Sequence, residues 1–122
     1  MPQKILIIED DKFVRDLITK LLTQEGFEIS IAVDGKEGIK KLEEESPDLV
    51  LLDLLLPGID GFEILTKRKT DSKLLKIPVI ILSNLGQKEE IEKGLELGAV
   101  NYLIKAHFSP REIVNKIKKV FE

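Results

Sequence analysis

The chain has no cysteine and no tryptophan, and it has only one histidine, one tyrosine and one methionine in 122 residues. Without cysteine it can form neither disulfide bonds nor thiolate metal sites, which agrees with a cytoplasmic setting. No apolar run approaches the length of a membrane span, and the N-terminus lacks the apolar core of a signal peptide. A net charge of −3 gives no electrostatic reason to expect nucleic acid or a membrane as partner.

What the chain does contain is typical of a folded, soluble protein. Hydrophobic residues make up 43% of the sequence and charged residues 34%, a balance that argues against disorder. A length of 122 residues is enough for one hydrophobic core but not for two. We therefore predict that residues 1–122 form a single domain, with no further output domain.

Short apolar runs alternate with longer amphipathic segments, which predicts five successive strand and helix pairs. The predicted strands are Ile5–Ile8, Phe27–Ile31, Leu49–Asp53, Val79–Leu82 and Tyr102–Ile104. The predicted helices are Lys12–Glu25, Gly35–Glu45, Asp60–Thr70, Gln87–Leu97 and Pro110–Phe121. Gly94 lies within the fourth helix and lowers its helix propensity, which favours a movable element.

Uninterrupted apolar strands separated by helices predict an α/β fold, in which a mainly parallel sheet is covered on both faces. The second strand alternates apolar and polar residues, so it belongs at an edge of the sheet. Right-handed crossovers then favour the flavodoxin-like, doubly wound (βα)5 arrangement with strand order 2-1-3-4-5. In that order the functional crevice lies beyond the carboxyl ends of strands one and three.

Acidic residues follow both of these strands. Glu9, Asp10 and Asp11 come directly after the first strand, and Asp53 ends the third. Carboxylates this close destabilise a fold unless a positive charge lies among them. The sequence offers two sources of that charge: Lys105, which follows the fifth strand, or a hard divalent cation, for which Mg²⁺ fits the oxygen ligands best.

The fourth strand ends in Ser83, which adds a hydroxyl to the same edge of the sheet. A carboxylate, a lysine, a hydroxyl and a metal ion together suit phosphoryl transfer, which needs charge neutralisation and positioning more than covalent machinery. Asp53 is the predicted nucleophile, since an aspartate can accept a phosphoryl group as an acyl phosphate. The only histidine, His107, has no second soft ligand near it in the sequence and is interpreted as a surface residue.

Four motifs in register resemble the response-regulator receiver domains of two-component signalling, including the single-domain chemotaxis regulator. The motifs are Ile8-Glu9-Asp10-Asp11, Leu52-Asp53-Leu54-Leu55-Leu56-Pro57-Gly58-Ile59-Asp60-Gly61, Ile81-Leu82-Ser83 and Gly98-Ala99-Val100-Asn101-Tyr102-Leu103-Ile104-Lys105. Together they extend over essentially the whole chain. The resemblance implies a phosphorylation switch that catalyses only its own phosphorylation and dephosphorylation.

The resemblance also implies a role for each matching residue. Asp53 would be the phosphoacceptor, while Glu9, Asp10, Asp53 and the backbone carbonyl of Leu55 would hold Mg²⁺, with Asp11 only a neighbour. Ser83 and Lys105 would contact the phosphoryl group. Tyr102 would turn inward with Ser83 and change the surface formed by helix four, strand five and helix five.

The implied partners are a sensor histidine kinase or phosphotransfer protein and an unknown downstream protein. No direct binding to nucleic acid or membrane is expected. The oligomeric state would be a monomer or a weak, phosphorylation-dependent dimer.

Some positions depart from the family pattern. Ala106 stands where proline usually follows the lysine, which implies either a strained loop or a trans peptide with a shifted lysine. Asn84 replaces a commonly small residue. These departures leave open a pseudo-receiver that acts as a constitutive interaction module. An aspartyl-phosphate hydrolase ranks last, because Leu55 stands where such enzymes carry a second acid.

Local structural explanations also exist for each candidate. Asp11 is suited to cap the first helix whatever the other acids do. Ser83 could be a loop hydroxyl, Lys105 a surface lysine and Tyr102 a partly buried aromatic of an edge strand.

Overall fold

The computed structural model describes residues 2–122, in which strands and helices alternate from one end to the other. The strands are β1 (Lys4–Ile8), β2 (Glu28–Ala32), β3 (Leu49–Leu52), β4 (Val79–Ser83) and β5 (Asn101–Ile104). The α-helices are α1 (Lys12–Gln24), α2 (Gly35–Glu45), α3 (Gly61–Lys69), α4 (Lys88–Glu96) and α5 (Pro110–Val120). A short 3-10 helix, η1 (Lys105–His107), connects β5 to α5.

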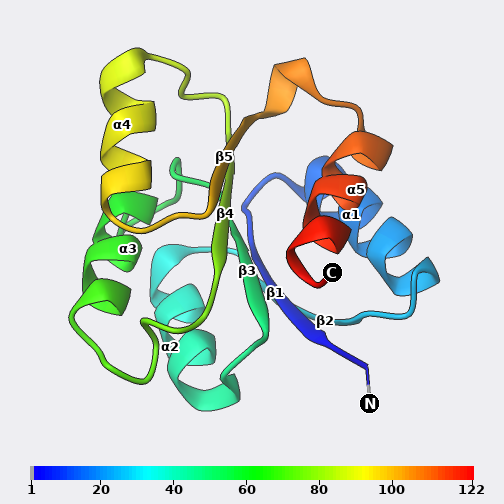
Figure 1. Cartoon of the computed structure of the whole chain (residues 1–122), viewed down its shortest axis with the longest axis horizontal. Helices are drawn as coiled ribbons and strands as arrows, with labels where there is room; N and C mark the ends of the chain where they lie inside the picture. Colours follow the sequence, from blue (N-terminus) through cyan, green and yellow to red (C-terminus); the bar gives the residue numbers. More distant parts are fainter. Residues whose placement is uncertain (1) are drawn as a thin grey trace.

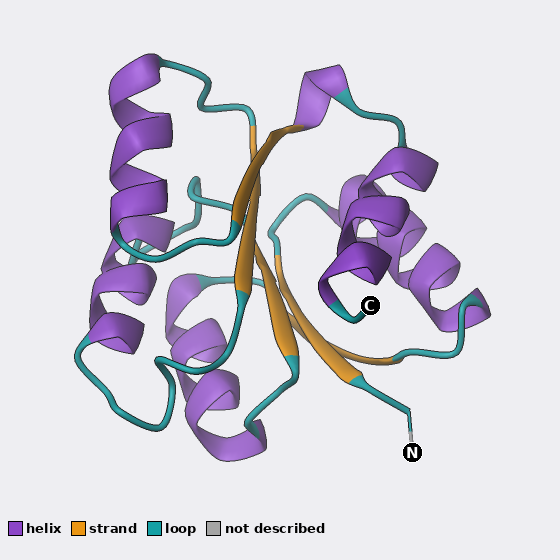
Figure 2. Ribbon diagram, viewed as in Figure 1, coloured by secondary structure: helices purple, strands orange, loops and turns teal. Residues whose placement is uncertain are grey.

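The strands form one parallel sheet with the order β2-β1-β3-β4-β5. Helices α1 and α5 cover one face of this sheet, and α2, α3 and α4 cover the other (Figures 1 and 2). This arrangement confirms the predicted flavodoxin-like (βα)5 fold. It also places the carboxyl ends of β1 and β3 side by side, at the point where the connections diverge to opposite faces.

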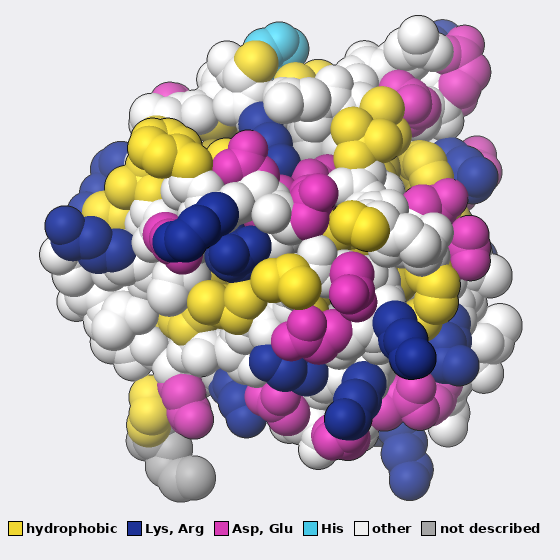
Figure 3. Space-filling view, turned by 180° about the vertical axis from the view of Figure 1, so that it is seen from behind, with side chains coloured by type: hydrophobic (Ala, Val, Ile, Leu, Met, Phe, Trp, Pro, Cys, Tyr) yellow, Lys and Arg dark blue, Asp and Glu magenta, His cyan; other side chains and the backbone are white. Residues whose placement is uncertain are grey.

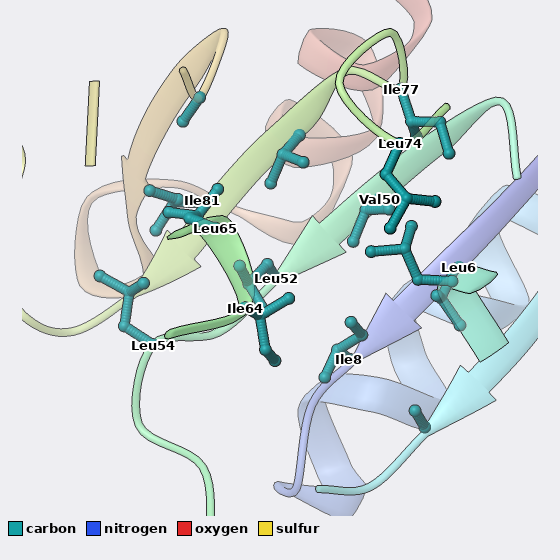
Figure 4. Packing of buried hydrophobic residues seen from close by; sticks show 14 residues of the cluster. Leu6, Ile8, Val50, Leu52, Leu54, Ile64, Leu65, Leu74, Ile77 and Ile81 are labelled. Atoms are coloured by element: carbon teal, nitrogen blue, oxygen red, sulfur yellow. The ribbon is translucent and has the colours of Figure 1, made fainter. Parts of the chain in front are cut away.

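The sheet separates two layers of buried apolar side chains. Leu6, Ile8 and Leu52 point toward α2 and α3, where they pack against Ile64 and Leu65 (Figure 4). The alternate residues of the same strands point toward α1 and α5 and form the second layer. Because both faces are covered, the central strands are apolar apart from Lys4 at the start of β1 and Ser83 at the end of β4, which is why the sequence shows continuous apolar runs there.

Side-chain caps define where four of the helices begin. Asp11 accepts a hydrogen bond from the Val14 N–H at 3.2 Å, and Asp34 and Asp60 cap α2 and α3 in the same way. Ser109 and Glu112 form a reciprocal capping box at α5. The expected capping role of Asp11 is therefore confirmed, and the chain turns sharply from β1 into α1.

Gly94 has a packing function that the sequence did not suggest. A Cβ atom at this position would lie 2.6 Å from Ile81 Cδ1 and 3.1 Å from Tyr102 Cδ2. The missing side chain thus lets the backbone of α4 approach β4 and the Tyr102 ring closely. Close packing of α4 against the sheet therefore offsets the low helix propensity of glycine at this position.

The surface carries both signs of charge. Basic and acidic side chains are interspersed on the face seen in Figure 3, with small apolar patches between them. None of the helices within residues 2–122 has the length and apolar character needed to cross a bilayer.

Candidate functional site

Two of the predicted acids lie next to each other at the carboxyl edge of the sheet. Glu9 and Asp53 follow the last residues of the paired strands β1 and β3, Ile8 and Leu52. The Asp53 N–H donates to the Ile8 carbonyl at 3.0 Å, so the ladder of the sheet extends to the acid itself. Only 3% of Glu9 and 4% of Asp53 is exposed. The sheet therefore fixes two carboxylates in a position that little water reaches.

Lys105 supplies a positive charge to both acids. Its Nζ lies 2.7 Å from Glu9 Oε1 and 2.8 Å from Asp53 Oδ2. The peptide bonds within residues 2–122 are all trans, including the one before Ala106. The trans alternative of the two predicted for this loop is therefore observed, but the lysine still reaches the acids.

The second oxygen of each buried carboxylate accepts a backbone hydrogen bond. Glu9 Oε2 accepts from the Asp11 N–H at 3.1 Å. Asp53 Oδ1 accepts from the Leu55 N–H, also at 3.1 Å. These bonds fix the direction of both side chains, and they place the backbone of Leu55 beside the Asp53 carboxylate while its side chain is exposed.

Asp10 completes a group of carboxylates suited to a metal ion. One oxygen from each of Glu9, Asp10 and Asp53 lies within 4.8 Å of the others, and Asp10 is exposed to solvent. Asp11, which caps α1, is outside this group. Carboxylate oxygens are the ligands that hard divalent cations prefer, and an exposed side leaves room for water ligands. The donor set therefore fits Mg²⁺ or a similar cation.

Ser83 and Tyr102 are brought together through the backbone of Leu85. Ser83 is fully buried, and its Oγ accepts from the Leu85 N–H at 3.4 Å. The Tyr102 hydroxyl donates to the Leu85 carbonyl. Burial, followed by the negative charges of Glu90 and Asp53, raises the pKa of Tyr102 to about 12, so the hydroxyl stays a donor. One peptide segment thus contacts both predicted switch residues.

Two further residues from the sequence analysis are exposed to solvent. Asn84 is exposed in the loop after β4. His107 is exposed in η1, in agreement with its interpretation as a surface residue.

Sequence reasoning missed Arg15, whose guanidinium contacts the loop that carries the acids. Its Nη1 donates to the Glu9 carbonyl at 3.1 Å and to the Asp10 carbonyl at 3.4 Å. A usable signal was its place near the start of α1, where a cation opposes the helix dipole.

Burial dominates the ionisation of Glu9. Burial raises the pKa of Glu9 to about 7, with the Asp53 charge adding to the rise and the Lys105 hydrogen bond opposing it. For Lys105, burial acts to lower the pKa, but the bonds to Asp53 and Glu9 outweigh it and the pKa is raised. The lysine therefore stays charged between its two partners.

The raised pKa of Glu9 predicts how the stability of the metal-free protein depends on pH. The pKa rises from 4.5 in the unfolded chain to about 7 in the fold, so the folded state binds more protons between these values. The stability that depends on Glu9 is then fully present below pH 4.5 and is lost as pH rises toward 7, by on the order of 2 kcal/mol. Urea unfolding in EDTA at several pH values measures this fall.

The Glu9→Gln variant is the control for this pH dependence, because it keeps the shape of the side chain without the titration. We expect a much flatter profile between pH 5 and 7.5 for this variant. A wild-type profile as flat as that of the variant would contradict the assignment.

Comparison with known proteins agrees with this geometry. Residues 5–118 match the family described as the response regulator receiver domain. The phosphate regulon transcriptional regulatory protein PhoB of Escherichia coli (strain K12) is 39% identical over 120 residues, which is 98% of this chain and 52% of that protein. The chain thus spans about half the length of the curated relatives it matches.

Solved structures share the fold over nearly the whole chain. A putative response regulator from Chloroflexus aurantiacus J-10-fl is 31% identical with a TM-score of 0.90, covering 98% of both chains. The Mn²⁺-bound form of response regulator Rcp1 is 30% identical with a TM-score of 0.87, covering 98% of this chain and 94% of that one. On its sequence, its fold and the acids at the edge of its sheet, this chain belongs to the response-regulator receiver domain family of two-component signalling.

Proposed function

We propose that this chain is a phosphorylation-dependent signalling switch, which accepts a phosphoryl group on Asp53 from a histidine kinase or phosphotransfer protein. The observation that carries the proposal is the buried Asp53 carboxylate, 2.8 Å from the Lys105 ammonium and within a group of three acids. A buried carboxylate at this edge of the sheet has little structural use, because an apolar residue would fill the same place at lower cost. Its chemistry is the better explanation.

In the proposed reaction an oxygen of Asp53 bonds to phosphorus, and the bond between phosphorus and the donor nitrogen breaks. The donor imidazole leaves with the electron pair of that bond. The Lys105 Nζ, which contacts the Asp53 carboxylate, would move its contact to the phosphoryl oxygens as negative charge passes to them. The Ser83 hydroxyl would donate to the same oxygens. The chain therefore promotes its own modification and is no enzyme for other substrates.

The proposed cofactor is Mg²⁺, held by Glu9, Asp10, Asp53 and the backbone carbonyl of Leu55. The donor set supports this assignment, since carboxylate and carbonyl oxygens suit Mg²⁺ and Mn²⁺ alike. The Mn²⁺-bound form of the similar protein Rcp1 is in line with a divalent cation. When bound, such an ion would neutralise charge on the transferred phosphoryl group.

The proposed output is a change at the surface formed by α4, β5 and α5. Ser83 and Tyr102 both hydrogen-bond to the peptide groups of Leu85, so a Ser83 hydroxyl drawn to a phosphoryl group would disturb the Tyr102 contact. We propose that partners are proteins and not nucleic acid, and that the chain is a monomer or a weak dimer. A single domain over residues 1–122 and a cytoplasmic setting remain predictions. The pseudo-receiver is the alternative function that the experiment below separates.

Intact mass spectrometry after incubation with a small-molecule phosphodonor tests the proposal. With Mg²⁺ present, we expect a gain of one phosphoryl group that maps to the tryptic peptide 42–67, and we expect EDTA to abolish it. No gain with Mg²⁺ would favour the pseudo-receiver. A gain on another peptide would contradict the assignment of the site.

A further inference from the structure

The guanidinium of Arg15 lies behind the loop that carries Glu9 and Asp10. A single nitrogen, Nη1, donates to the backbone carbonyls of both acids, at 3.1 and 3.4 Å. Arg15 is half-buried and lines one small pocket together with Glu9 and Asp53. The side chain thus reaches from α1 to the carboxyl edge of the sheet.

The two acids differ in how their side chains are held. Glu9 is fixed at both oxygens, by Lys105 and by the Asp11 N–H. Within residues 2–122, by contrast, no hydrogen bond or ion pair from the protein holds the Asp10 carboxylate, which is exposed. The direction of the Asp10 side chain therefore depends on its backbone. The hydrogen bonds from Arg15 to the Glu9 and Asp10 carbonyls help to orient that backbone.

The positive charge of Arg15 is unfavourable at this position in two ways. A cation near the N-terminus of α1 opposes the helix dipole, and a cation beside a metal site repels the metal ion. Both effects disfavour an arginine at this position. The hydrogen bonds to the two carbonyls are the contribution that offsets them, because the two hydrogens on this one charged nitrogen can each serve one carbonyl.

We propose that Arg15 is a positioning residue for the metal site: it orients the Glu9–Asp10 backbone so that Asp10 offers its carboxylate beside Glu9 and Asp53. The inference rests on the proposed function, since it takes these three acids to be the metal ligands. In this proposal Arg15 is not itself a ligand of the metal ion. It acts only through the loop.

The test is the Mg²⁺ affinity of the metal-free protein, measured by calorimetric titration and by amide chemical shifts of Asp10 and Leu55. Three variants separate geometry from charge. Arg15→Gln removes both the charge and the reach to the carbonyls. Arg15→Lys keeps the charge on a shorter side chain that lacks the planar guanidinium. Lys12→Gln removes a neighbouring charge that pairs with the exposed Asp16.

Arg15→Gln is expected to weaken Mg²⁺ binding about tenfold, the low end of what supporting residues contribute to metal sites. Simple electrostatics predicts the opposite sign, since removing a positive charge favours a cation. Arg15→Lys should fall between wild type and Arg15→Gln. Lys12→Gln should bind Mg²⁺ as tightly as wild type or slightly more tightly.

Two results would overturn the assignment of Arg15. One is wild-type or tighter Mg²⁺ binding by Arg15→Gln. The other, if Arg15→Gln fails to fold in urea titrations, is wild-type affinity in a folded Arg15→Lys protein, whose shorter side chain lacks the guanidinium that contacts the loop. Wild-type protein that binds no Mg²⁺ would instead overturn the metal site of the proposed function, so the two failures are distinguishable.

Discussion

The Asp53→Asn variant is expected to accept no phosphoryl group from a small-molecule phosphodonor, even with saturating Mg²⁺. An amide oxygen is a poor nucleophile, so the variant lacks the carboxylate to which we assign the transfer. The variant should still fold. Its amide oxygen can accept the Leu55 N–H, and Lys105 keeps its 2.7 Å contact with Glu9. We expect the free energy of unfolding to change by no more than about 1 to 2 kcal/mol.

Asp60→Asn is the matched control for this loss. Asp60 is exposed, caps α3 through the Glu63 N–H at 3.0 Å, and lies on the same tryptic peptide as Asp53. Asparagine caps helices about as well as aspartate, so this variant should fold and gain one phosphoryl group at the wild-type rate. A mass gain in Asp53→Asn, or its loss in Asp60→Asn, would place the acceptor elsewhere.

The fold could be predicted from the sequence because its main signals are local. Continuous apolar runs such as Val79–Leu82 indicate a strand that is buried on both faces, and Ser109-Pro110 indicates the start of a helix. The strand order followed from one alternating strand at the edge and from the handedness of crossovers. The approach of Glu9 to Asp53 followed in turn from that order.

The contacts between side chains could not be predicted in the same way. The sequence offered Lys105 as one source of positive charge for the acids, but it did not indicate which oxygens the lysine contacts, or that Arg15 binds the carbonyls behind them. Gly61 is a further example, since a Cβ there would lie 2.7 Å from the Asp53 carbonyl oxygen and 2.7 Å from Leu54 Cα. These features depend on distances across the fold, whereas helix and strand patterns depend on neighbours in the chain.

Lys105→Met is expected to destabilise the metal-free protein by about 3 kcal/mol at pH 8, the range found when one partner of a buried ion pair is removed. Methionine keeps the length of the side chain but leaves Glu9 and Asp53 buried without a cation. Their repulsion would raise the pKa of Glu9 above about 7, so the loss should shrink at pH 5, where Glu9 is protonated. Urea unfolding at both pH values, with and without Mg²⁺, measures these differences.

The same variant separates the two sources of positive charge that the acids require. If a divalent cation and Lys105 both neutralise this site, saturating Mg²⁺ should restore much of the stability lost in Lys105→Met. Phosphoryl transfer should remain about 100-fold slower than in the wild type. A cation held by the acids does not replace the Lys105 ammonium, which would donate hydrogen bonds to the phosphoryl oxygens. Lys105→Arg keeps the charge with a different shape, so it should recover stability better than transfer. Transfer at the wild-type rate in Lys105→Met would show that Lys105 serves the fold alone.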